Sequence, residues 1–86
     1  MNGVDINELL AAIDDFISGA NQSRVHANKI EGIILEHFMG EQWFDDVSIA
    51  LAQFSPGGGT NYYDEKALAI ELKAVSDILR AQLKAK

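Results

Sequence analysis

Cysteine is absent from this 86-residue sequence, which also contains a single proline and only seven basic residues. Without cysteine the chain has no disulfide, no thiolate metal ligand and no cysteine nucleophile. No run of residues approaches the roughly 20 apolar positions that a membrane-spanning helix requires. The first residues lack the basic segment that opens a secretory signal, so we expect a cytoplasmic protein.

Acidic residues outnumber basic ones by 13 to 7, which gives a formal net charge of −6. A net-negative surface repels nucleic acid and anionic lipid, so we expect neither as a partner. Residues 1–46 hold nine of the acids and only two of the bases, Arg24 and Lys29. Helix electrostatics explains the bases near the C-terminus but not this acidic excess. The composition therefore favours a basic macromolecule as partner.

Apolar side chains recur at helical spacing along nearly the whole chain. The pattern predicts helices over residues 5–18, 22–39, 41–54 and 64–84, with a loop over 55–61. Gly19 and Gly40 are expected to end the first two helices. Short turns at these glycines make successive helices antiparallel. The sequence therefore predicts one all-α domain over residues 1–86, an antiparallel four-helix bundle.

The same spacing indicates which side chains form the core. Val25 of the second helix and Ile78 of the fourth are expected to face inward. His26 and His37 are expected at the boundary of the apolar face. The central core is predicted to consist of large apolar side chains from the last two helices: Trp43, Phe44, Leu51, Phe54, Leu72, Val75 and Leu79.

No group of residues has the spacing that catalysis or metal binding requires. His26 and His37 lie eleven positions apart, which is not a helical metal-site spacing. Asp45 and Asp46 are neighbours and point about 100° apart on a helix, so they form no catalytic dyad. Residues 46–49 read Asp-Val-Ser-Ile, which lacks the Asp-Ser-Leu of acyl carrier proteins. We therefore expect no enzyme activity, no metal and no cofactor.

The outward face of the third helix is the first candidate binding surface. Ile49 falls opposite the apolar stripe, among Asp45, Asp46 and Gln53. An isolated exposed isoleucine is unremarkable. An isoleucine surrounded by carboxylates and amides also suits an apolar anchor within an acidic rim. Both interpretations are open at this point.

The second candidate surface is the junction Tyr62–Glu65 between the loop and the fourth helix. Two adjacent tyrosines cannot both point into a small core, so one is expected to pack and the other to be exposed. Asp64 is also a natural helix cap. In an antiparallel bundle this junction would lie at the same end as Asp14 and Asp15. An acidic pole with two tyrosines would result.

Three segments in the second half of the chain form a more specific pattern. Residues 50–56 read Ala-Leu-Ala-Gln-Phe-Ser-Pro, residues 61–65 read Asn-Tyr-Tyr-Asp-Glu, and residues 68–72 read Leu-Ala-Ile-Glu-Leu. In this order they resemble the C-terminal half of the colicin D immunity protein family. The resemblance implies a four-helix bundle that binds the nuclease domain of a bacterial toxin, often a ribonuclease that cleaves transfer RNA. Such proteins cover the toxin's basic active-site cleft with acidic side chains, and related ones serve contact-dependent growth inhibition.

The resemblance also bears on which residues contact the toxin. Positions that carry acids in the family are Ala52, Ser55 and Gly57 here, so the charge must come from elsewhere. The resemblance favours the Tyr62–Glu65 junction, with the third helix as the rival. The predicted toxin-contacting residues are Tyr62, Tyr63, Asp64, Glu65, Asp45, Asp46, Ile49 and Gln53.

An immunity protein is expected to be a monomer when free and to form a 1:1 complex with its toxin domain. The alternative function is a helical adaptor, a secretion chaperone or a small structural subunit of a bacterial complex. Chaperones of that kind usually dimerise through exposed apolar surface, so the oligomeric state separates the two functions.

Overall fold

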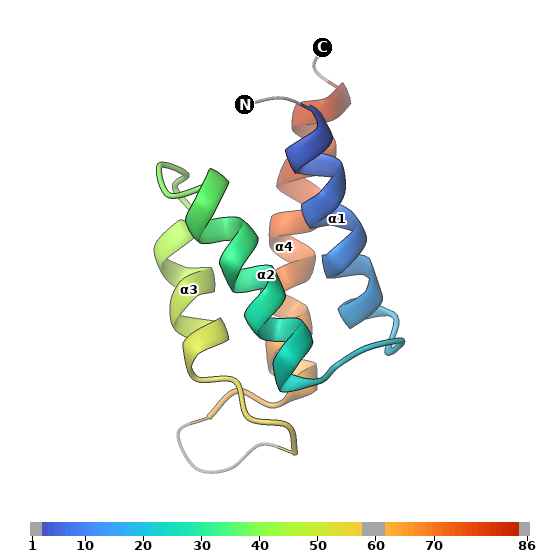
Figure 1. Ribbon diagram of the computed structural model, residues 1–86, viewed down its shortest axis with the longest axis vertical. Coiled ribbons are helices and arrows are strands. Elements are labelled where there is room, and N and C mark those ends of the chain that lie inside the picture. The colour runs from blue at the N-terminus through green and yellow to red at the C-terminus, as the bar shows by residue number, and fades with distance from the viewer. Residues whose placement is uncertain (1–2, 58–61, 85–86) are drawn as a thin grey trace.

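The computed structural model describes the backbone of residues 3–57 and 62–84, and the side chains of these ranges from residue 6 onward. The described residues form four helices: α1 (Gly3–Ile17), α2 (Arg24–His37), α3 (Phe44–Ala52) and α4 (Glu65–Lys84). α1 packs against α2 and α4, and α3 packs against the same two helices. Successive helices run in opposite directions (Figure 1). The predicted antiparallel four-helix bundle is confirmed.

The turn between α1 and α2 forms as the sequence predicts. Gly19 has a φ of +86°, and its N–H lies 3.2 Å from the carbonyl oxygen of Phe16. This left-handed conformation ends a helix at little cost only at glycine. Ser23 then caps α2, because its Oγ accepts a hydrogen bond from the His26 N–H at 3.1 Å. The start of α1 differs from the prediction. α1 begins at Gly3, so Asp5 lies within its first helical turn rather than at the start of the helix.

The turn between α2 and α3 also differs from the prediction. α2 ends at His37, because Phe38 leaves the helical conformation with a φ of −128° and buries its ring. The N–H of Glu41 then donates to the carbonyl of Phe38, and the N–H of Phe44 to the carbonyl of Glu41, both at 3.1 Å. Two successive tight turns therefore replace the predicted end at Gly40 and the predicted first turn of the third helix.

A single apolar core runs through the bundle and includes most of the predicted side chains. Trp43 and Phe44 are exceptions, because they are half-buried at its edge. Phe16 of α1 and Phe54 contact each other edge-to-face, with ring centroids 5.4 Å apart. The largest fully buried side chains are Leu9, Ile13, Phe16, Ile30, Ile34, Phe38, Val47, Leu51, Leu68, Leu72, Val75 and Leu79.

Two residues that we expected to face inward are exposed. Val25 is 78% exposed, because five positions separate it from buried Ile30 and five positions turn a helix by about 140°. His26 takes the inward place and is buried, rather than lying at the boundary. Ile78 is 40% exposed, since it lies about 100° around α4 from buried Leu79. Ile78 is therefore part of the surface of the bundle.

Candidate partner-binding surface

The outer face of α3 has the arrangement that the sequence predicts. Val47, Ala50 and Leu51 face the core and are buried. Ile49 points the other way and is 53% exposed. The side chains around it on this outer face are exposed as well: Asp45, Asp46, Ala52 and Gln53. An apolar side chain thus lies in the open, surrounded by carboxylates and an amide.

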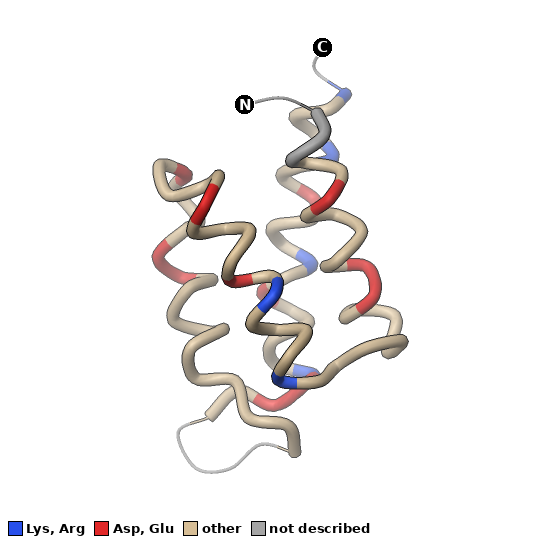
Figure 2. Tube along the Cα trace, viewed as in Figure 1, with Lys and Arg blue, Asp and Glu red and all other residues tan. Residues whose placement is uncertain are grey.

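The stretch of sequence that contains α3 carries acidic residues and no Lys or Arg. Residues 30–65 contain seven acidic residues and no Lys or Arg. Figure 2 shows acidic positions along the second half of α2 and the start of α3, and basic positions mainly along α4 and the first half of α2. Within the described residues, the carboxylates of Asp45 and Asp46 make no hydrogen bond and no ion pair. Both remain open to a cationic partner.

The carboxylates of the Tyr62–Glu65 junction are engaged inside the protein instead. The Oδ1 of Asp64 accepts a hydrogen bond from the Ala67 N–H at 2.8 Å, so Asp64 caps α4 as predicted. The two carboxylate oxygens of Glu65 lie 3.0 and 3.2 Å from the N–H of Gly57. Gly57 has a φ of +84°, a left-handed conformation that favours glycine. Both carboxylates therefore have a structural role: Asp64 caps α4, and Glu65 links α4 to the chain before the loop.

The two tyrosines of this junction take different positions. Tyr62 is 60% exposed, whereas Tyr63 is half-buried and packs against the core. The backbone fixes this choice, because the Ser55 N–H donates to the Tyr63 carbonyl at 2.8 Å and the Tyr63 N–H donates to the Gln53 carbonyl at 2.9 Å. One tyrosine packs and the other is exposed, as the sequence predicts.

These backbone hydrogen bonds also bring the two candidate surfaces together. Gln53 belongs to the outer face of α3, and its backbone is hydrogen-bonded directly to that of Tyr63.

Asp14 and Asp15 do not lie beside these two candidate surfaces. Asp14 pairs with Arg80 at 2.8 Å, and Arg80 lies sixteen positions after Asp64, about 24 Å along α4. The expected acidic pole of four carboxylates is wrong, because α1 packs beside the C-terminal part of α4.

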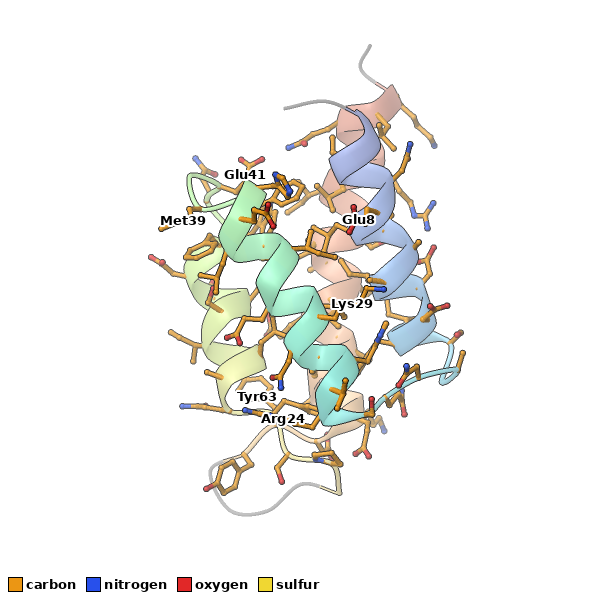
Figure 3. All side chains as sticks on the ribbon, viewed as in Figure 1. Glu8, Arg24, Lys29, Met39, Glu41 and Tyr63 are labelled. Carbon is orange, nitrogen blue, oxygen red and sulfur yellow. The ribbon has the colours of Figure 1, made fainter. Side chains whose placement is uncertain are left out.

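A hollow that the sequence did not predict lies between the α2–α3 turn and α4. It has a volume of about 600 Å³ and is lined by Gly40, Glu41, Gln42, Trp43, Ile78 and Gln82. It exists because Trp43 and Ile78, both expected in the core, lie at the surface. The sequence signal for it was a tryptophan three residues after the turn glycine Gly40. Figure 3 shows Glu41 and Met39 at this end of the bundle, with Arg24 and Tyr63 at the other.

The described residues contain no group of three His, Asp or Glu side chains placed to hold a metal ion. None of the helices in the described part of the chain is long and apolar enough to cross a membrane. The outer face of α3 offers carboxylates, an amide and an apolar side chain. These groups bind partners by charge and packing.

Comparisons with protein-family models, with curated proteins and with solved structures gave no match to this chain.

Proposed function

We propose that this protein is a cytoplasmic immunity protein that binds and neutralises a basic nuclease toxin domain. The outer face of α3 is the primary contact, and it covers the toxin's active-site cleft with acidic side chains. The observation that carries the proposal is a pair of exposed carboxylates, Asp45 and Asp46, which have no partner among the described residues and lie beside exposed Ile49. A cleft that binds polyanions has a positive potential, so an acidic partner gains both association rate and specificity.

The choice of α3 over the Tyr62–Glu65 junction rests on which carboxylates are available. Asp64 and Glu65 already accept hydrogen bonds from backbone N–H groups. A toxin cation would compete with those bonds, whereas Asp45 and Asp46 have no such bonds among the described residues. Tyr62 is exposed near Gln53 and extends the same contact toward the loop. The resemblance of residues 50–79 to the colicin D immunity proteins supports the function independently of this charge argument.

The decisive experiment uses the protein encoded immediately upstream of this chain, because immunity genes lie directly downstream of their toxins. Its C-terminal domain is expected to cleave transfer RNA and to lose that activity when the purified chain is added in equimolar amount. Replacing both Asp45 and Asp46 by Lys should weaken binding by about 2–5 kcal/mol, as loss of a desolvated charge pair does. Calorimetric titration at low and high salt measures the change.

A matched control separates the effect of the α3 face on binding from the effect of the overall charge. Replacing Glu8 and Asp15 by Lys alters the net charge by the same amount, on exposed positions of α1. α1 packs against α2 and α4, away from α3. This variant should change mainly the association rate and leave the affinity within about threefold of the original. Equal losses from the two double variants would rule out α3 as the contact.

A helical adaptor or structural subunit is the second candidate, and the exposed apolar side chains favour it. Leu35, Met39, Ile49 and Ile70 are all exposed, and an adaptor would use such side chains to dimerise. Analytical ultracentrifugation of the free protein distinguishes the two functions. A monomer supports the immunity function, and a stable dimer supports the adaptor.

A further inference from the structure

The hollow beside Trp43 has a composition that suits one kind of side chain. Its apolar part comes from the indole of Trp43 and from Ile78, which is 40% exposed. Its polar lining residues are Glu41, Gln42 and Gln82. No described Lys or Arg lines the hollow, so the chain itself does not neutralise Glu41 there. We infer that this hollow binds an arginine side chain of the partner protein.

The indole of Trp43 is held in a position that suits binding of a cation. Its ring centroid lies 5.7 Å from that of Phe38, which is almost fully buried, so packing on the core holds the indole in place. Its Nε1 is buried and makes no hydrogen bond within the described residues. Trp43 lines the hollow. Tryptophan is the aromatic side chain that attracts a cation most strongly.

The remaining lining selects arginine over other side chains. A guanidinium is planar and weakly hydrated, so it stacks on an aromatic ring more readily than a lysine ammonium does. Its N–H groups match the carboxylate of Glu41 and the amide oxygens of Gln42 and Gln82. Its aliphatic stem can lie over Ile78. An anionic side chain would be repelled by Glu41, and an apolar one would leave that carboxylate unpaired.

The hollow also adjoins the surface that the proposed function uses. Trp43 directly precedes α3, and Asp45 and Asp46 lie in the first turn of that helix. The arginine would therefore come from the same basic nuclease domain that covers α3, and in this respect the inference rests on the proposed function. Binding of a guanidinium in the hollow of the free protein does not depend on that function.

The first test uses the free protein and short peptides. Trp43 is the only tryptophan in the chain, so its fluorescence reports on the hollow alone. Titration with acetyl-Gly-Arg-Gly-amide at constant ionic strength should change the emission saturably, with a dissociation constant of about 1–10 mM for a single side chain. The lysine peptide should bind at least about threefold more weakly, and the citrulline peptide should give no saturable change. Equal responses to all three peptides, or none to arginine, would overturn the inference.

Two pairs of variants assign the effect to the hollow. Ile78→Lys introduces an ammonium at the lining, whereas Ile70→Lys makes the same change on the same helix at a residue that is 66% exposed and outside the hollow. Glu41→Gln removes the lining carboxylate, and Glu8→Gln removes an exposed carboxylate of α1. The lining variants should weaken binding of the arginine peptide by about threefold to tenfold, and the controls by less than twofold. Equal effects within each pair would mean nonspecific attraction and would overturn the inference.

The second test uses the toxin domain and distinguishes the two proposals. Ile78→Lys should weaken the complex by at least about fivefold relative to Ile70→Lys. If the toxin domain binds equally well to both variants, the inference falls and the immunity function stands. If the arginine peptide binds in the hollow but the toxin domain does not bind the chain at all, the immunity function falls and the hollow remains an arginine-binding site.

Discussion

The imidazole of His26 joins α2 to α1, because its Nε2 lies 2.7 Å from the carbonyl oxygen of Ala12. A carbonyl oxygen can only accept, so Nε2 carries the proton and donates. His26 is 6% exposed, so this contact is largely shielded from water. His26→Ala should therefore lower the free energy of unfolding by about 1–3 kcal/mol, through a lost hydrogen bond and a cavity.

Urea unfolding followed by circular dichroism at 222 nm (a helix band) measures this change. Asn28→Ala is the control, since Asn28 is an exposed position of the same helix. Its free energy of unfolding should stay within about 0.5 kcal/mol of the original. Equal stabilities of the two variants would show that the contact to Ala12 contributes nothing.

The aromatic side chains should differ in their contributions to stability according to burial. Phe54 is buried and contacts Phe16 edge-to-face, so Phe54→Ala should cost about 3–5 kcal/mol. Trp43 is half-buried at the rim of the hollow, so Trp43→Ala should cost less, about 1–2 kcal/mol. Thermal unfolding of both variants gives the order. A larger loss at Trp43 than at Phe54 would contradict the described core.

Arg24 should stabilise the end of α3 across the bundle. Its Nη1 donates to the carbonyl of Phe54, and it lies 3.5 Å from the carbonyl of Leu51. These carbonyls belong to a helix end, where the dipole favours a cation. Arg24→Ala should cost about 1–2 kcal/mol. Lys29→Ala makes the same charge change on the same helix at an exposed position, and it should cost less than about 0.5 kcal/mol in the same denaturation experiment.

Tyr62 and Tyr63 should have separable roles. Tyr63 packs against the core, so Tyr63→Ala should lower the melting temperature by several degrees. Tyr62 is exposed, so Tyr62→Ala should leave the melting temperature unchanged and weaken toxin binding. Calorimetry of each variant, alone and with the toxin domain, checks both statements. A stability loss at Tyr62 equal to that at Tyr63 would contradict the one-in, one-out arrangement.

The local features of the fold could be predicted from sequence because each depends on a few neighbouring residues. Gly19 ends α1 because glycine adopts the left-handed conformation readily. Asp64 caps α4 because its side chain reaches an N–H three residues ahead. The outward position of Ile49 follows from the helical repeat alone. These features require no knowledge of which helices meet.

Tertiary packing decided the rest, because it depends on contacts between residues far apart in the chain. Helical periodicity placed Ile78 in the core, but the way α4 faces its neighbours leaves it at the surface. Likewise, the rings of Phe38 and Trp43 contact each other across the α2–α3 turn, with centroids 5.7 Å apart, and no local pattern predicts this contact. α1 lies beside the C-terminal part of α4, so Asp14 meets Arg80 rather than the Tyr62–Glu65 junction. Local patterns were enough to predict the helices and the acidic outer face of α3. The hollow, and the lack of a partner for Asp45 and Asp46 among the described residues, depend on how the helices pack.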